Sequence, residues 1–393
     1  MSRTNDVGSM AGVKVLELGR LLAAPGCAQV LADLGADVIK VERKGEGDNF
    51  RRYGPAFVTP PEGETGSESS GWLSVNRNKR ALALDFSDAA DLAAVQDLAR
   101  HCDVFIENFL PGTLTRYGLD YQSLAAVNPG IVYVSITGFG HDGPYADRPG
   151  TDGVCQALSG LQSVTGEPHG APQKVGVMVV DMVTGLNAAI AILAALRARD
   201  VQKTGGQFID MALMDTAMSL MAQKAIDYRL SGEEPRRAGN ATYGSAPSNT
   251  YRCADGLMFV QAAWDDHFAR FCKCIGREDV ARDPRFSSWD GRVHNQAALD
   301  AIITDEMSKY MVRELEAKFG AAGILHAPVN TIAQALNHPQ VKHRGIEIRL
   351  THKWGVEVPS IASPYRLSKT PVTYRLAPPI QNQDGDEART AWN

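Results

Sequence analysis

Short apolar runs alternate with longer amphipathic stretches over the first 230 residues of the chain. The apolar runs predict strands at 13–18, 37–42, 81–86, 104–108, 131–137 and 207–211. Helical patterns occupy intervals between them, including 89–100 and a nearly featureless apolar stretch at 181–199. Strands that alternate with helices indicate a parallel sheet covered on both faces. We therefore expect an α/β protein whose large domain contains a Rossmann-like parallel sheet.

The pattern changes beyond residue 230. Between 231 and 248, Gly, Pro, Asn and Arg dominate and apolar periodicity is lost, which indicates a linker or a mobile loop. A single strand at 257–261 among charged helical segments suits a smaller α+β domain. The predicted divisions are a large α/β domain at 1–225, a small α+β domain at 226–330 and a return segment at 331–393 that completes the large domain. We expect the polar end of the chain, 382–393, to fray.

Composition and charge narrow the class of protein. Hydrophobic residues make up 44% of the 393 residues and charged residues 22%, as in ordinary globular proteins. The net charge of -5 disfavours a nucleic-acid partner, which would need a basic surface. The six cysteines show neither zinc-site nor disulfide spacing, so we expect no metal. The first residues show no signal peptide, and the apolar stretch 186–196 is too short to span a bilayer, so we expect a cytoplasmic protein without a membrane partner.

Basic and aromatic residues gather around the ends of the predicted strands. Ligands of open parallel sheets bind beyond the carboxyl ends of the strands. The residues found near strand ends are Arg43, Lys79, Asn108, Phe109 and Arg116. If the basic groups converge, they would suit a ligand with several phosphates, and Phe109 offers a flat face for a base. Taken singly, each basic residue is more often a solvated surface charge than a ligand-binding group.

Most familiar catalytic motifs are absent from the sequence. The first β–α turn lacks G-x-G-x-x-G, and no G-x-x-x-x-G-K-[ST], G-x-S-x-G or H-E-x-x-H occurs, which disfavours NAD and P-loop chemistry. Asp181 stands out because it follows four apolar residues and opens the apolar helical stretch. Spacing alone favours an N-cap. The alternative is a carboxylate that the helix N-terminus keeps ionised and that attacks a thioester carbonyl.

Five segments resemble a known family when taken in order. They are VLELGRLLAAPGCAQVLADLGADVIKVERKGEGD (15–48), NRNKRALALD (76–85), DVFIENFLPGTLTRYGLD (103–120), SITGFGHDGPYADRPGTDGVCQALSG (135–160) and VVDMVTG (179–185). Together they resemble class III CoA-transferases, the CaiB/BaiF family, which includes formyl-CoA and carnitine CoA-transferases and, as a divergent branch, α-methylacyl-CoA racemases. The resemblance implies acyl-CoA and a small carboxylic acid as substrates, with no further cofactor. It also implies an intertwined homodimer.

The resemblance also assigns roles to individual residues. Asp181 matches the catalytic aspartate of the family, and Asp152 matches an acidic active-site position. The positions that match CoA-binding residues are Leu21, Leu22, Arg43, Lys79, Asn108, Phe109 and Arg116. Gly239 and Gly244 match a glycine-rich loop over the active site, although only two glycines remain here. Arg148 could hold the carboxylate of an acceptor or be an exposed loop arginine.

The racemase branch offers an alternative reaction. Its proton shuttle resembles a histidine followed by an acid, whereas this chain has Thr151 and Asp152. A threonine hydroxyl does not exchange protons near neutral pH, so racemisation is disfavoured, and His141 is expected to be a surface histidine. Asp152 is expected to orient a substrate or to serve a turn. The favoured reaction moves CoA from a donor to a dicarboxylic acid through an aspartyl anhydride and an aspartyl-CoA thioester; the remaining alternatives are a 2-methylacyl-CoA racemase and a non-catalytic CoA-binding protein.

Overall fold

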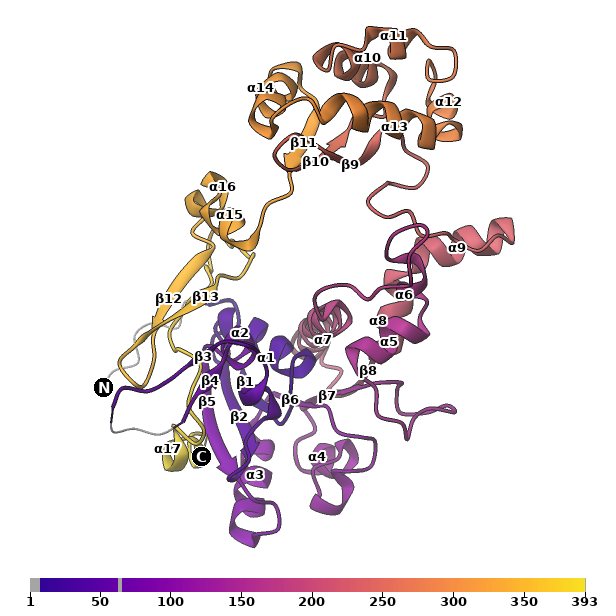
Figure 1. Cartoon of the computed structure of the whole chain (residues 1–393). Coiled ribbons are helices and arrows are strands. Elements are labelled where there is room, and N and C mark those ends of the chain that lie inside the picture. Colours follow the sequence, from indigo (N-terminus) through magenta and orange to yellow (C-terminus); the bar gives the residue numbers. More distant parts are fainter. Residues whose placement is uncertain (1–7, 63–65, 393) are drawn as a thin grey trace. The chain divides into compact units, whose positions relative to one another are not determined.

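A six-stranded parallel sheet forms the centre of the larger part of the molecule (Figure 1). The structure, a computed structural model, describes residues 8–62 and 66–392. The strand order is β5-β2-β1-β6-β7-β8 and every neighbouring pair is parallel. The strands are β1 (Lys14–Glu17), β2 (Asp37–Arg43), β5 (Lys79–Leu84), β6 (Val104–Glu107), β7 (Val132–Thr137) and β8 (Gln207–Ala212). The predicted α/β fold with a large parallel sheet is confirmed.

Helices cover both faces of this sheet. Helices α1 (Ala23–Asp33) and α7 (Val179–Arg197) pack on one face, and α3 (Ala89–His101) and α4 (Tyr121–Val127) on the other. Burial on both faces explains why the strands read as continuous apolar runs rather than as alternating ones. The contact between α1 and α7 requires Gly185, because a Cβ there would lie 2.6 Å from the carbonyl oxygen of Ala23. This close contact sets the position of α7 beside the start of α1.

Helix α7 is longer than the apolar stretch 186–196 suggested. It runs from Val179 to Arg197 and continues as a π-helical turn at 198–202. The whole helical segment 179–202 is long and apolar enough to cross a membrane by length and composition alone, although the stretch 186–196 within it is not. One side of α7 is buried in the core beside α1. The other side exposes a stripe of large apolar side chains, namely Met182, Leu186, Ile190 and Leu193.

The chain folds as two compact units. The first comprises Met1–Leu161, Val175–Ser231 and Lys342–Asn393, and the second comprises Gln162–Lys174 and Gly232–Val341. The second unit has its own core under an antiparallel sheet of β9 (Ser248–Arg252), β10 (Leu257–Gln261) and β11 (Leu325–Pro328). The units differ from the predicted divisions, because 162–174 lies in the second unit and α9 (Ala222–Ser231) runs unbroken across residue 225.

Shorter elements complete both units. The strands are β3 (Phe57–Val58), β4 (Glu68–Ser69), β12 (Glu347–Thr351) and β13 (Glu357–Ile361). The 3-10 helices are η1 (Asn49–Arg52) and η2 (Thr115–Tyr117). The remaining helices are α2 (Ser70–Val75), α5 (Asp152–Leu158), α6 (Leu161–Val164), α8 (Leu213–Leu220), α10 (Asp265–Cys274), α11 (Glu278–Arg282), α12 (Trp289–His294), α13 (Gln296–Met307), α14 (Val312–Ala322), α15 (Ile332–Asn337), α16 (Pro339–His343) and α17 (Gly385–Arg389).

The end of the chain is ordered against the edge strand β5. The backbone N–H of Ala81 donates to the carboxylate of Asp384, and the N–H of Ala83 donates to the side-chain oxygen of Asn382. Helix α17 follows, and Trp392 beyond it is 5% exposed in the core under α3. The prediction that 382–393 frays was therefore wrong for the described residues, 382–392. Their side chains satisfy the unpaired N–H groups of a sheet edge, which their polar composition did not indicate.

Candidate active site

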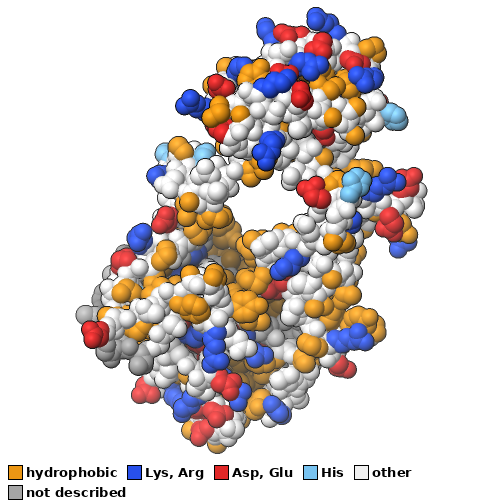
Figure 2. Space-filling view, viewed as in Figure 1, with side chains coloured by type: hydrophobic (Ala, Val, Ile, Leu, Met, Phe, Trp, Pro, Cys, Tyr) orange, Lys and Arg blue, Asp and Glu red, His pale blue; other side chains and the backbone are white. Residues whose placement is uncertain are grey.

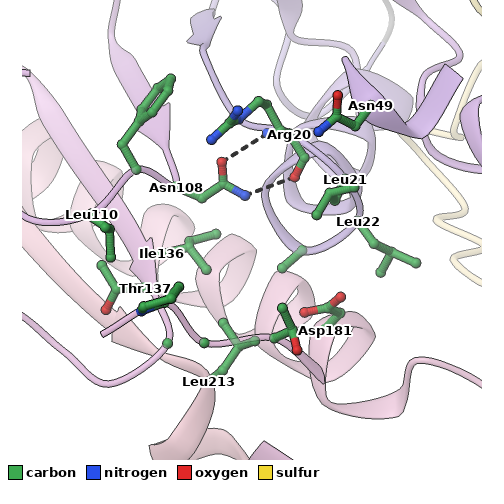
Figure 3. Close-up of a pocket in the computed structure, with 16 residues that line it drawn as sticks. Arg20, Leu21, Leu22, Asn49, Asn108, Leu110, Ile136, Thr137, Asp181 and Leu213 are labelled. Carbon is green, nitrogen blue, oxygen red and sulfur yellow. Dashed lines mark hydrogen bonds between the residues drawn. The ribbon is translucent and has the colours of Figure 1, made fainter. Parts of the chain in front are cut away.

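A cavity of about 350 Å³ lies at the carboxyl ends of β1, β6 and β7, within the first unit (Figure 3). Its walls come from the turn that follows each of these strands, from the segment before α5, and from the first turn of α7. The lining residues are Arg20, Leu21, Leu22, Ala23, Asn49, Asn108, Phe109, Leu110, Ile136, Thr137, Gly138, Pro149, Gly150, Thr151, Asp181 and Leu213. The predicted nucleophile thus lies at the edge of the sheet where ligands of parallel α/β proteins bind.

Asp181 is the third residue of α7 and does not cap it. The N-cap position belongs to Met178, which makes no side-chain capping bond. The N-cap interpretation that spacing alone favoured was therefore wrong. Burial first, and the neighbouring Asp152 charge second, raise the pKa of Asp181 to about 7. Burial thus opposes the effect of the helix N-terminus, which was expected to keep this carboxylate ionised.

Asp152 acts on Asp181 through the backbone. One carboxylate oxygen of Asp152 accepts the N–H of Val180 at 2.8 Å and that of Asp181 at 3.2 Å. The other oxygen accepts a hydrogen bond from the side-chain amide of Gln156 at 2.6 Å. Asp152 is 7% exposed and does not line the cavity. The geometry disagrees with a direct catalytic role and favours one in which Asp152 caps the first turn of α7 and so orients Asp181.

Asp152→Asn is expected to shift the pH dependence of activity. Asparagine keeps an oxygen that can accept the helix N–H groups but removes the negative charge, so the pKa of Asp181 should fall. A carboxylate nucleophile reacts in its ionised form, so with Asp181 in the predicted role the acidic limb of the kcat/KM profile should move to lower pH by up to about one unit. Burial remains, so the limb should stay above pH 4. The measurement is the rate profile between about pH 5 and about pH 9. Asp142→Asn, an exposed change in a nearby loop, is the control, and an unmoved limb in Asp152→Asn would contradict the argument.

Four of the predicted CoA-binding residues line this cavity, and two more line a neighbouring cavity. Leu21, Leu22, Asn108 and Phe109 lie in the cavity of Asp181. The side chain of Asn108 holds the backbone of Arg20 by both its N–H and its carbonyl oxygen, at 2.9 and 2.8 Å (Figure 3). The second cavity, of about 500 Å³, contains Arg43 and Arg116. The two cavities adjoin, since both are lined by Arg20, Asn49 and Phe109.

Lys79 does not reach either cavity. It is 1% exposed, and its ammonium group contacts Glu17, Asn76 and the carbonyl oxygen of Pro25. Its assignment to CoA phosphates is contradicted by this burial. The strand periodicity places Lys79 on an inner face of the sheet, where it pairs with a carboxylate instead of solvent.

The remaining predicted residues do not line the cavity of Asp181, and two of them belong to the other unit. The guanidinium of Arg148 lies 4.0 Å from the ring of Tyr145 and lines neither cavity. Gly239 and Gly244 have φ values of 60° and 72° and belong to the second unit, so their role as a loop over the site stays a prediction. His141 is half-buried and its Nε2 lies 2.7 Å from the hydroxyl of Ser135, so the surface interpretation was wrong.

The sequence interpretation missed Arg20, Asn49, Thr137 and Leu213 as lining residues. Among the described residues around the cavity, Arg20 is the one that carries a positive charge, and its guanidinium lies 5.1 Å from the ring centre of Phe109. Arg20 follows β1 within three residues, so the strand-end survey that found Arg43 could have found it. In the part of the chain that the structure describes, no group of three or more His, Cys, Asp or Glu side chains could hold a metal ion.

Comparison with known proteins identifies the family. The model of the family described as CoA-transferase family III matches residues 10–385. The chain is 39% identical to succinate–glutarate CoA-transferase of Agrobacterium fabrum, over 94% of this chain and 92% of that protein. It is 35% identical to human succinyl-CoA:glutarate CoA-transferase, over 97% of this chain and 85% of that protein. The crystal structure of a CaiB/BaiF family protein from Brucella suis superposes with a TM-score of 0.89 at 39% identity, over 98% of this chain and 100% of that one. The resemblance of the five ordered segments is thereby confirmed: the chain belongs to CoA-transferase family III and is a CoA-transferase.

Proposed function

We propose that this enzyme transfers CoA from an acyl-CoA to a free dicarboxylic acid and that Asp181 carries the acyl group. The observation that carries the proposal is the position of Asp181, a half-buried carboxylate with a pKa raised to about 7, in a cavity at the carboxyl edge of the sheet. A raised pKa makes the ionised carboxylate a stronger nucleophile than a solvated aspartate. Partial burial also limits the access of water to the reactive intermediates.

The proposed reaction conserves the energy of the thioester. The Asp181 carboxylate attacks the acyl carbonyl carbon of the donor, the carbon–sulfur bond breaks, and CoA thiolate leaves a mixed anhydride on Asp181. Thiolate is a good leaving group, since thiols have a pKa of about 8.5. The thiolate then attacks the aspartyl carbonyl and releases the donor acid, which leaves an aspartyl-CoA thioester. The carboxylate of the acceptor attacks this thioester, which expels CoA thiolate and forms a second mixed anhydride on Asp181. The thiolate then attacks the acyl carbon of the acceptor in this anhydride, which yields the new acyl-CoA and regenerates the Asp181 carboxylate.

The two adjoining cavities suit the two ends of an acyl-CoA. The larger one offers Arg43 and Arg116 for phosphates, and the smaller one offers apolar walls and Asp181 for the thioester. Arg20 and Phe109 line both, so a single extended ligand could contact them at the junction. Among the described lining residues of the smaller cavity, Asp181 is the one that titrates near neutral pH, whereas a two-base racemase needs two such groups.

A dicarboxylic acceptor is proposed from the relatives. The proteins named above act on succinate and glutarate by their names, and a relative from Acetobacter aceti, 34% identical, is named for oxalate. The test is to incubate the enzyme with succinyl-CoA and a panel of acids and to measure the new CoA esters. Transfer to glutarate or another dicarboxylic acid, well above transfer to the monocarboxylic acids of matching length, is the expected result. Equal rates for both classes would reject the dicarboxylic preference.

We further propose a cytoplasmic homodimer in which the exposed stripe on α7 contacts a second copy. Figure 2 shows hydrophobic side chains gathered over the region of α7, and Ile190 within the stripe is 64% exposed. A symmetric dimer would cover the same stripe on both chains. All six cysteines are free thiols, as suits a reducing compartment.

Light scattering should give twice the chain mass of 42.4 kDa for the wild-type protein. Ile190→Asp should shift the protein toward 42.4 kDa, because a charge in the interface would lack a partner. The control is Val127→Asp, an exposed apolar position at the end of α4, on the face of the sheet opposite to α7. A wild-type monomer would reject the dimer.

A further inference from the structure

The turn between β1 and α1 forms one wall of the cavity in a strained conformation. Leu21, Leu22 and Ala23 lie next to one another in this wall. Leu21 has a φ of 63°, in the left-handed region. For a residue other than glycine, asparagine or aspartate this conformation is strained, so other contacts must hold it.

A buried set of charges lies directly beneath this turn. The Lys40 ammonium contacts Glu17 at 2.8 Å, Asp48 at 3.1 Å and the carbonyl oxygen of Gly19 at 2.6 Å. The three charged side chains are at most 2% exposed. Hydrogen bonds from an ammonium group to a carbonyl are strong in such surroundings, because water does not compete for either partner. Lys40 therefore ties the start of the turn to the sheet.

Two further contacts hold the rest of the turn. One carboxylate oxygen of Asp48 accepts the N–H of Leu21 at 3.1 Å and that of Phe50 at 2.9 Å. Lys79 pairs with the second carboxylate oxygen of Glu17 at 2.8 Å and donates to the carbonyl oxygen of Pro25 at 2.8 Å. The turn is thus bound at Gly19, Leu21 and Pro25. The buried network consists of Glu17, Lys40, Asp48 and Lys79, and its two positive and two negative charges balance.

We propose that this buried network positions the strained turn for acyl transfer, so that Glu17, Lys40, Asp48 and Lys79 are positioning residues. None of them lines the cavity of Asp181, and of the four only Asp48 borders the second cavity, among the described residues. Their effect passes through the backbone at Leu21 to the wall that faces the acyl group. The inference rests on the proposed function for its readout, which is the rate of CoA transfer.

The test uses the left-handed conformation of Leu21. Asp48→Ala removes both the acceptor of the Leu21 N–H and the partner of Lys40, and should lower kcat about tenfold or more while KM for the acyl-CoA changes less than about threefold. Asp48→Asn keeps an oxygen acceptor and should therefore lower kcat less than Asp48→Ala does. Glycine adopts a positive φ without strain, so in the Leu21→Gly background the same Asp48→Ala change should lower kcat by less than about threefold.

Asp33→Asn is the matched control, because it disrupts another buried ion pair of the same unit, between Asp33 and Arg77 at 2.6 Å, at the far end of α1. It should lower the melting temperature without lowering kcat. Equal losses of kcat from Asp48→Ala with leucine and with glycine at position 21 would overturn the inference. If Asp48→Ala does not fold, the same comparison is made with Asp48→Asn.

The wild-type enzyme separates the two proposals. Trapping with hydroxylamine should modify Asp181 in the presence of an acyl-CoA. Absence of transfer and of this adduct in the wild type would reject the proposed function. Normal transfer and trapping, together with no coupling between positions 48 and 21, would reject the positioning network alone.

Discussion

Asp181→Asn should reduce the rate of CoA transfer at least about 1000-fold, because the amide that replaces the carboxylate cannot form the acyl anhydride. Asparagine has nearly the same shape, and the N–H of residue 181 that Asp152 accepts belongs to the backbone, so the first turn of α7 should persist. The affinity for CoA should change little. The measurement is kcat/KM for transfer together with direct binding of CoA.

Hydroxylamine trapping gives the matching chemical observation. In the wild type, the modified carboxyl should be Asp181, identified by mass spectrometry of a digest. Asp97→Asn, a change of a carboxylate on α3 that lines neither cavity, should leave transfer unchanged. Undiminished transfer in Asp181→Asn, or an adduct on another side chain, would show that Asp181 is not the nucleophile.

The same variant should change the pH dependence of stability. The pKa of Asp181 is raised, so folding favours its protonated form, and this contribution is fully present below the ordinary pKa of 3.8 and is lost as pH rises through about 7. Asp181→Asn removes the contribution. Relative to the wild type, its melting temperature should therefore increase from pH 4 to pH 8. A constant difference across this range would show that the pKa of Asp181 is not raised.

Trp392→Ala should have the largest effect on stability, with a loss of about 3–5 kcal/mol. Trp392 is buried in the core under α3, and its indole N–H donates to Asp37 at 2.8 Å. Its removal leaves a cavity in this core, while Asp37 on β2 keeps its ion pair with Arg80 at 2.7 Å. The melting temperature of this large unit should fall by about 6–15 °C.

Glu387→Gln provides the control for Trp392, because Glu387 is an exposed residue on the neighbouring helix α17. It should change the melting temperature by no more than about 1–2 °C. If Trp392→Ala melts like the wild type, the chain end does not contribute to the core. Since the end of the chain lies against β5, which is remote from Asp181, kcat in Trp392→Ala should be retained below the melting temperature.

Local patterns were sufficient for the sheet but not for the chain end. Each central strand is an apolar run of a few residues flanked by turn or helix signals, and both faces of the sheet bury such runs. Residues 382–393 show no apolar run. Their order depends on Asn382 and Asp384 meeting the free N–H groups of β5, some 300 residues earlier. No local sequence pattern within the segment predicts that pairing.

The residues of the site likewise differ in whether local sequence patterns were sufficient to assign them. Asp181 could be selected from its position at the start of an apolar helix, and the resemblance gave it a role. Lys79 was misassigned because the sequence does not show whether a basic residue beside a strand faces solvent or a buried carboxylate. In the register of the sheet Glu17 lies directly beside Lys40, and Lys79 reaches the other oxygen of Glu17. This inward pairing depends on three strands that are far apart in sequence.

The sequence by itself therefore determined the parallel α/β architecture, the family and the candidate nucleophile among its carboxylates, since these depend on periodicity and on ordered local motifs. Only the tertiary structure decided that Asp181 is not a cap, that its pKa is raised and that Asp152 acts through the α7 backbone. It also decided that Lys79 belongs to a buried network under the turn of Leu21. The physical reason is that burial and charge pairing are properties of surroundings, and those surroundings are assembled from segments that are distant along the chain.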